Sequence, residues 1–474
     1  MGHLLFLQGR VSKKLMHRYQ VESQQQGKSS FAFAWVLDET DEERARGITT
    51  DVAVNCKCAT HPAGPCSFLC VHCSLCPFLS LLLVCCLASV FETPTKKITL
   101  LDAPGHKEFI PNMITGAAQA DAGILVIPAT KGEFEGGWSE DGQIREHAVL
   151  ARSLGVSQLI LAINKLDTCG WSQSRYDEIV AQLLPWLKSV GYKAHDLSVI
   201  PVSGLTGENI MTRSEPALSW YNGPVLLDLI DQFHAPPRQV DLPLRMCVQD
   251  VFKTLTLGQA VAGKIETGTI LPRDRLLLLP LNETVVVKSM ESRGEMINIA
   301  RAGDNIELGI KDFSDPSVLQ VGQWLCDPLH PIPMVVHFRA QIITMTNFKV
   351  PLLAGTQLVF FNQACAEPVS LHSLHSIVDK TTGAVIKRNP RVVPKSATAI
   401  VEITSKNKIC LELFRTVKSL GRFSLRRGQE TVACGIVTSH TTKHNAARTR
   451  LFSGLRLTLV SVSVRVCAGL YRMQ

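Results

Sequence analysis

The fold is decided by one stretch, Lys97-Ile-Thr-Leu-Leu-Asp102-Ala103-Pro104-Gly105-His106, in which a short apolar run ends in an acid and a glycine turn follows. The run predicts a strand over residues 97–102, and α/β sheets bind ligands where their strands end. The Asp102 carboxylate is suited to hold Mg²⁺ through water, and Gly105 can bring a bare N–H to a γ-phosphate that a side chain would block. His106 is then predicted to lie beside the water molecule that attacks the γ-phosphate during hydrolysis.

Three further apolar runs along the first half of the chain read as strands. They are Gly123–Pro128, Gln158–Asn164 and Leu197–Pro201, and stretches of helical spacing, Gly142–Leu154 and Ser174–Val190, lie between them. Apolar strands that alternate with helices predict an α/β fold with a parallel sheet covered on both faces.

Two of these strands are followed by motifs suited to reading a purine base. Asn164-Lys165-Leu166-Asp167 follows the run 158–164, and Ser203-Gly204-Leu205 follows the run 197–201. The Asp167 carboxylate can accept both the N1–H and the 2-amino group of guanine, which adenine does not offer. Asn164 would tie the loops together, the stem of Lys165 would pack along the ring, and a backbone N–H of the Ser203 turn would meet guanine O6. We therefore predict GTP or GDP as the ligand.

A threonine upstream completes the predicted set. Thr49 follows the acidic run 38–43, and a hydroxyl in a mobile loop can add to Mg²⁺ coordination while the γ-phosphate is present. Taken alone, the segment around Thr49 is better interpreted as a charged surface loop. The order of the four elements (Thr49, the Asp102 turn, the Asn164 motif, the Ser203 turn) favours a GTPase over four coincidences.

The second half of the chain has a different texture, in which short strand-like runs alternate with turn signals. This predicts two all-β barrels after the α/β domain. We place the α/β domain at residues 1–235, the barrels at 240–330 and 333–438, and an atypical tail at 439–474. The runs are Leu244–Val251, Ala260–Ile265, Arg275–Pro280, Glu283–Ser289 and Gly303–Leu308, then Val335–Ile343, Gln357–Phe361, Ala397–Ile403 and Val432–Val437.

Longer segments resemble the elongation factor 1-alpha superfamily of translation-type GTPases. Residues 32–38, 43–49, 102–121 and 132–135 resemble its G domain, Gly263–Gly268 its second domain, and residues 411–414 and 420–426 its third. Residues 110–121 and 203–209 lean toward the Hbs-like ribosome-rescue factors, and Ser203-Gly-Leu rather than Ser-Gly-Trp argues against the elongation factor itself.

The resemblance implies a cytoplasmic GTP hydrolase that docks a release-factor-like partner, Pelota in the rescue case, on a stalled ribosome. A net charge of +8 fits contacts with ribosomal RNA. No stable membrane association is expected. Two alternatives stay open: an elongation or termination role in the same group, and a protein that binds a partner without catalysis.

The sequence departs from the family at its phosphate-binding loop, which needs Gly-x-x-x-x-Gly-Lys-Ser/Thr between a strand and a helix. Gly27-Lys28-Ser29 has Glu22 five positions before it and a polar stretch upstream, so we interpret it as a decoy. Residues 1–7 resemble the helix that follows the true loop. We therefore expect the first strand and the loop to be missing, and the chain as written to bind GTP poorly.

The second departure is a stretch rich in cysteine and leucine over residues 55–90. Residues 67–91 carry no charge and are long enough to span a bilayer, Cys70, Cys73, Cys76 and His72 offer Zn²⁺ ligands, and translated non-coding sequence is the third and favoured explanation. The tail after residue 438 receives the same interpretation. The cysteines scattered elsewhere predict buried free thiols of a reduced protein.

Overall fold

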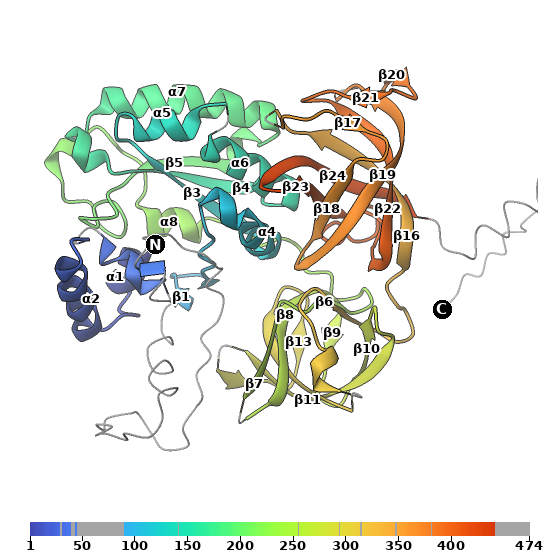
Figure 1. Cartoon of the computed structure of the whole chain (residues 1–474). Coiled ribbons are helices and arrows are strands. Elements are labelled where there is room, and N and C mark those ends of the chain that lie inside the picture. Colours follow the sequence, from blue (N-terminus) through green and yellow to red (C-terminus); the bar gives the residue numbers. More distant parts are fainter. Residues whose placement is uncertain are drawn as a thin grey trace, which may run out of the picture. The chain divides into compact units, whose positions relative to one another are not determined.

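The structure is a computed structural model, and Figure 1 shows its elements along the chain. It describes residues 1–28, 31–38, 43–44, 90–140, 142–254, 256–292, 294–312, 315–346, 348–380 and 382–440. The described part lies within one compact unit, residues 1–440. None of its helices combines the length and the apolar character that a bilayer crossing requires. Thr49, the tail after residue 440 and the stretch 55–90 except its last residue lie outside the described residues.

The predicted parallel sheet is confirmed, with three strands in the order β3-β4-β5. Its central strand pairs in parallel with both neighbours, so that Pro128 lies opposite Asn164, and Ile163 lies opposite Pro201. The three strands therefore end along one edge. Their bounds are Ala122–Pro128 for β3, Gln158–Asn164 for β4 and Leu197–Pro201 for β5.

Alternate residues of β4 face opposite layers, as the strand's near-continuous apolar run requires. Leu159, Leu161 and Ile163 pack with residues of α5, α6 and α7, whereas Ile160 and Ala162 pack with residues of α1 and α8. Figure 1 shows α5 and α7 on one side of the sheet and α8 on the other. The helices are α1 Gly2–Leu7, α2 Lys13–Gln25, α4 Ile110–Gln119, α5 Glu133–Trp138, α6 Gln143–Leu154, α7 Gln173–Val190 and α8 Leu226–Asp231.

The strand expected over residues 97–102 is shorter than predicted and does not join the parallel sheet. β2 (Lys97–Thr99) pairs antiparallel with β1 (Val90–Glu92), and Ile98 and Leu100 pack into the cluster that includes Ile160 of β4. Packing against this cluster, rather than ladder hydrogen bonds to the sheet, holds the segment before Asp102. The prediction of a strand was therefore correct for residues 97–99. The expectation that this strand joins the parallel sheet was wrong, because it pairs with β1.

Gly27 and Lys28 follow helix α2, with the Gly27 N–H donating to the Gln24 carbonyl. A phosphate-binding loop follows a strand, whereas these two residues follow a helix. Ser29 lies outside the described residues, and the interpretation of Gly27-Lys28-Ser29 as a decoy stays a prediction. The apolar run at residues 1–7 is helical, as the resemblance implied.

The first predicted barrel is confirmed. Six strands follow one another in the order β10-β15-β6-β8-β14-β11, and β11 pairs with β10 to close the ring. The run expected over residues 244–251 is split between β6 and a separate strand, β7 (Asp250–Thr254). The barrel strands are β6 Arg245–Cys247, β8 Gly258–Thr267, β10 Arg275–Leu279, β11 Glu283–Ser292, β14 Asn305–Lys311 and β15 Trp324–Cys326.

The second barrel closes in the same way, in the order β18-β23-β24-β16-β22-β19 with β19 pairing to β18. Its interior is packed with Phe338, Phe360 and Phe423, whose ring centroids lie 5.0–6.0 Å apart. Two of its strands, β19 and β23, were not among the predicted runs. The strands are β16 Met334–Thr344, β18 Gln357–Asn362, β19 Cys365–Val378, β22 Thr398–Cys410, β23 Arg422–Arg427 and β24 Glu430–His440.

The prediction of buried free thiols holds for most described cysteines. Cys247, Cys326, Cys410 and Cys434 are buried and free, and burial raises the pKa of each thiol, whereas Cys169 and Cys365 are half-buried. Cys467 lies outside the described residues.

Candidate functional site

The ends of β4 and β5 bring the two base-reading motifs together. Parallel pairing places the loops after both strands at one edge of the sheet. There the Asn164 Oδ1 accepts a hydrogen bond from the Gly204 N–H at 2.8 Å. The backbone carbonyl of Asn164 also accepts from the Ala129 N–H at 2.7 Å. Asn164 therefore connects three loops, which is the role the sequence predicted for it.

The chain turns sharply after Asn164, and Asp167 lies in this turn. Lys165 has a φ of 62°, which starts a short 3-10 turn over Leu166–Cys169, and Leu166 is fully buried beneath it. The Oδ1 atom of Asp167 is buried and has no hydrogen-bond partner within the described part of the chain. A buried carboxylate oxygen without a donor is costly, so this atom is a clear candidate for bonding to a ligand.

The Lys165 ammonium forms an ion pair with the Glu133 carboxylate at 2.8 Å. Both side chains are about half exposed, so the pair contributes little to stability. It does tie Lys165, two residues before Asp167, to the first residue of α5. Glu133 belongs to the Gly132-Glu-Phe-Glu135 segment that carried part of the family resemblance, but no role was predicted for it.

The third predicted segment, Ser203–Leu205, forms a tight loop. Ser203 is fully buried and its Oγ accepts from the Thr206 N–H at 3.2 Å, whereas the Leu205 side chain is 54% exposed. The Gly204 carbonyl accepts a hydrogen bond at 2.8 Å from Nδ1 of His3, a residue of α1 that sequence reasoning did not single out. No local signal could have found His3, because 201 residues separate it from Gly204.

The Asp102 turn lies after β2 with its residues in different environments. Asp102 is partly buried, Pro104 is buried, and Ala103, Gly105 and His106 are exposed. Burial raises the pKa of the Asp102 carboxyl and lowers the pKa of the Met1 amino group, and the attraction between their charges opposes both shifts. Helix α1 thus starts near Asp102 and also carries the His3 contact to Gly204.

His106 begins a short 3-10 turn over Lys107–Phe109, and its Nδ1 accepts from the Glu108 N–H at 3.4 Å. Its side chain is 45% exposed, so it is accessible to water. Beside it, a Cβ added to Gly105 would lie 4.0 Å from Cε1 of His147, with nothing closer. The turn therefore leaves open space above the Gly105 backbone, as the approach of a phosphate requires.

Arg175 is a further residue that sequence reasoning missed. Its guanidinium is only 6% exposed and bonds the Ala129 carbonyl at 2.9 Å and the Glu135 carboxylate at 2.8 Å. Since Ala129 also bonds Asn164, Arg175 fixes the loop after β3 on which the base-side loops rest. Glu178, on the same helix, accepts a third bond from the Arg175 guanidinium at 2.9 Å.

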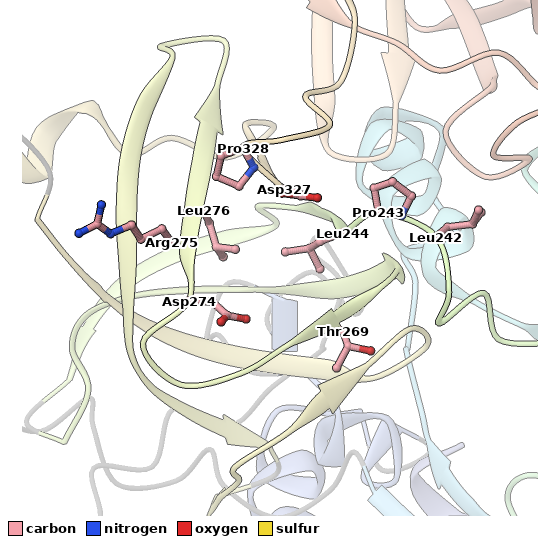
Figure 2. Close-up of a pocket in the computed structure, with 9 residues that line it drawn as sticks. All are labelled: Leu242, Pro243, Leu244, Thr269, Asp274, Arg275, Leu276, Asp327 and Pro328. Carbon is pink, nitrogen blue, oxygen red and sulfur yellow. The ribbon is translucent and has the colours of Figure 1, made fainter.

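A hollow of about 360 Å³ lies in the first barrel, away from these loops. Figure 2 shows Asp274 and Asp327 among its lining residues. Asp274 already accepts from the Leu271 N–H, and Asp327 from the Leu329 N–H and from the His330 ring. Both carboxylates of this hollow therefore already accept hydrogen bonds, whereas the buried Oδ1 of Asp167 has no partner among the described residues.

Comparison with known families agrees with this layout. Residues 1–254 match the family model described as the elongation factor Tu GTP binding domain. Residues 337–438 match the model described as GTP-eEF1A C-terminal domain-like. The first match contains the Asp102 turn and both base-side loops, and the second contains most of the second barrel.

Individual relatives give the same picture. The chain is 43% identical to Protein HBS1 of Drosophila melanogaster over 92% of its own length, and it spans 60% of that relative. It is 36% identical to elongation factor 1-alpha of Tetrahymena pyriformis, over 92% of both chains. Among solved structures, the GTPase-like domain of S. cerevisiae Ski7, bound to GTP, shares the fold with a TM-score of 0.67 at 18% identity, over 92% of this chain and 93% of that one.

Proposed function

Because the chain belongs to the elongation factor 1-alpha family of translation GTPases, we propose that it binds guanine nucleotide at the loops after β4 and β5 and serves ribosome rescue. The observation that carries the first part is the buried Oδ1 of Asp167, which has no hydrogen-bond partner among the described residues, beside the Asn164–Gly204 hydrogen bond. Guanine offers two donors, N1–H and the 2-amino group, to such a carboxylate.

The proposed roles of the remaining residues follow from their positions and chemistry. Asp102 and Thr49 supply oxygen atoms of the kind that Mg²⁺ prefers, and Mg²⁺ would neutralise charge on the phosphates. Gly105 offers its N–H to the γ-phosphate across the open space beside His147. His106, exposed next to Gly105, positions the attacking water. Lys165 packs along the base, held by Glu133.

The rescue role rests on the relatives. Identity to a protein named HBS1 is higher than to a protein named elongation factor 1-alpha, at 43% against 36%. We propose that the partner is a Pelota-like paralogue of release factors, that the complex acts on the ribosome in the cytoplasm with contacts to ribosomal RNA, and that no membrane is involved. Stable association with aminoacyl-tRNA instead, measured by copurification, would favour an elongation role and exclude the rescue proposal.

A second candidate is a protein that binds a partner without hydrolysis. The observation behind it is that Gly27-Lys28 follows helix α2 and so does not itself form a phosphate-binding loop after a strand. The two candidates differ in whether nucleotide binds at all.

Titration with a fluorescent GDP analogue in Mg²⁺ tests the guanine site, with Asp167→Asn as the matched variant. Xanthine carries an oxygen where guanine has the 2-amino group, so an asparagine amide can donate where the carboxylate accepted. We expect the wild type to prefer the guanine analogue and Asp167→Asn to prefer the xanthine analogue. Equal affinity for both bases in both proteins would overturn the guanine site.

Absence of binding by the wild type is a separate outcome. The same titration is then repeated on a version with a family-type strand and phosphate-binding loop placed before Met1. Recovered guanine binding would support the residues named here and assign the defect to the phosphate side. Absence of binding by both versions would favour the partner-binding candidate.

A further inference from the structure

The Gly204 peptide is held from both sides. Its N–H donates to the Asn164 Oδ1 at 2.8 Å, and its carbonyl accepts from the His3 Nδ1, also at 2.8 Å. A carbonyl oxygen can only accept, so the proton must reside on Nδ1 of His3. Burial lowers the pKa of the His3 imidazole, and hydrogen bonds to the backbone of Gly204 and Leu205 oppose that shift, so the net direction favours the neutral ring.

The His3 ring is fixed by its surroundings. It stacks on Phe33 with ring centroids 3.8 Å apart and planes within 5°, and the residue is only 8% exposed. On the other side lies Gly207, where an added Cβ would come within 2.7 Å of the ring and where φ is +81°. This packing restricts the ring and supports the hydrogen bond from Nδ1 to the Gly204 carbonyl.

The consequence for the base follows from peptide geometry. The Gly204 carbonyl and the Leu205 N–H belong to one peptide unit, and in a planar trans peptide these two groups point in opposite directions. Fixing the carbonyl against His3 therefore directs the Leu205 N–H away from α1. Rotation of this peptide unit changes ψ of Gly204 and φ of Leu205. Because Gly204 has no Cβ to restrict its backbone, the unit could otherwise rotate and present its carbonyl to the base.

We propose that His3 is a specificity-determining positioning residue: by anchoring the Gly204 carbonyl, it orients the Leu205 N–H toward O6 of a bound guanine. The inference rests on the guanine site proposed above and extends it to the O6 edge.

Two variants separate the hydrogen bond from the packing. His3→Phe keeps a ring to stack on Phe33 but removes the donor. His3→Asn keeps an N–H donor near the position of Nδ1 but removes the ring. Affinities are compared for GDP and 6-thio-GDP, which differ only in O6, sulfur being the weaker acceptor. We expect His3→Phe to weaken GDP binding by about three- to tenfold, the usual range for one neutral hydrogen bond, and to change 6-thio-GDP binding much less.

We expect His3→Asn to restore the preference for GDP over 6-thio-GDP. Equal weakening of both nucleotides in His3→Phe, or no weakening, would overturn the proposal and leave His3 a packing residue. If neither the wild type nor the version with an added phosphate-binding loop binds either nucleotide, the guanine site itself is wrong and the O6 role falls with it. That result differs from intact binding without O6 selectivity, so the two failures are distinguishable.

A nucleotide-free readout tests the anchor directly. In protein labelled with ¹⁵N at histidine, the signal that His3→Phe removes is assigned to His3. We expect that signal to show a neutral ring protonated at Nδ1. A proton on Nε2 alone would refute the His3–Gly204 hydrogen bond and the proposal with it.

Discussion

Breaking the ion pair between Arg245 and Glu412 is expected to cost the protein much of its stability. Arg245 lies in β6 of the first barrel, and Glu412 follows β22 of the second. The Nε and Nη2 atoms of Arg245 lie 3.1 and 3.0 Å from Oε1 of Glu412, and the two side chains are only 8% and 10% exposed. Water therefore cannot replace either partner.

The magnitude follows from this burial. Glu412→Leu leaves two donors of Arg245 without an acceptor, while its Nη1 keeps the bond to the Leu244 carbonyl. Removing one member of a buried pair costs about 3–5 kcal/mol, whereas replacing both members with apolar residues is often neutral or stabilising. We therefore expect Glu412→Leu to destabilise strongly and the double variant Arg245→Met/Glu412→Leu to recover most of the loss.

The cost is measured as the shift in the thermal unfolding midpoint, by calorimetry on the full chain of the wild type, the single variant and the double variant. The control is Glu430→Gln, which removes an exposed pair with Lys349 at 3.9 Å and is expected to cost under about 1 kcal/mol. A midpoint for Glu412→Leu no lower than that of Glu430→Gln would refute the reasoning. So would a double variant as unstable as the single one, because the cost would then come from lost packing and not from the stranded charge.

Three further outcomes are expected. Gly105→Ala should fold normally, because no described atom lies closer than 4.0 Å to the new Cβ. In parallel titrations, the variant should bind a non-hydrolysable GTP analogue more weakly than the wild type and bind GDP with unchanged affinity. Gly142→Ala should lower the melting temperature, because its Cβ would lie 2.1 Å from the Gly137 carbonyl oxygen; an unchanged melting curve would count against the described loop. Three side-chain donors lower the pKa of Glu402 from its ordinary 4.5 to about 2, so its contribution to stability is complete above pH 4.5 and is lost as pH falls toward 2. The stability difference between wild type and Glu402→Gln should therefore shrink over that range in acid denaturation.

The all-β part shows where sequence patterns stop being informative. β19 is the longest strand, with 14 residues, yet it was not predicted. Its pairing with β22 shifts register between Leu371 and Ser373 and again between Leu374 and Ser376, and each bulge breaks the period of two by which strands are recognised. Pro368 within it also argues against a strand on local grounds. Closure of the barrel, with β19 between β18 and β22, overrides both local signals.

The sequence by itself determined the three parallel strands, the two barrels and the order of the candidate motifs, because apolar period and strand-end chemistry are local properties. It also identified Asn164, Asp167 and Ser203–Leu205 as one group, since parallel strands must end together. Only the tertiary structure decided that β2 pairs away from the parallel sheet and that His3 anchors Gly204. Those contacts depend on which surfaces remain free once the sheet and helices have packed, and no pattern within a short window encodes that competition.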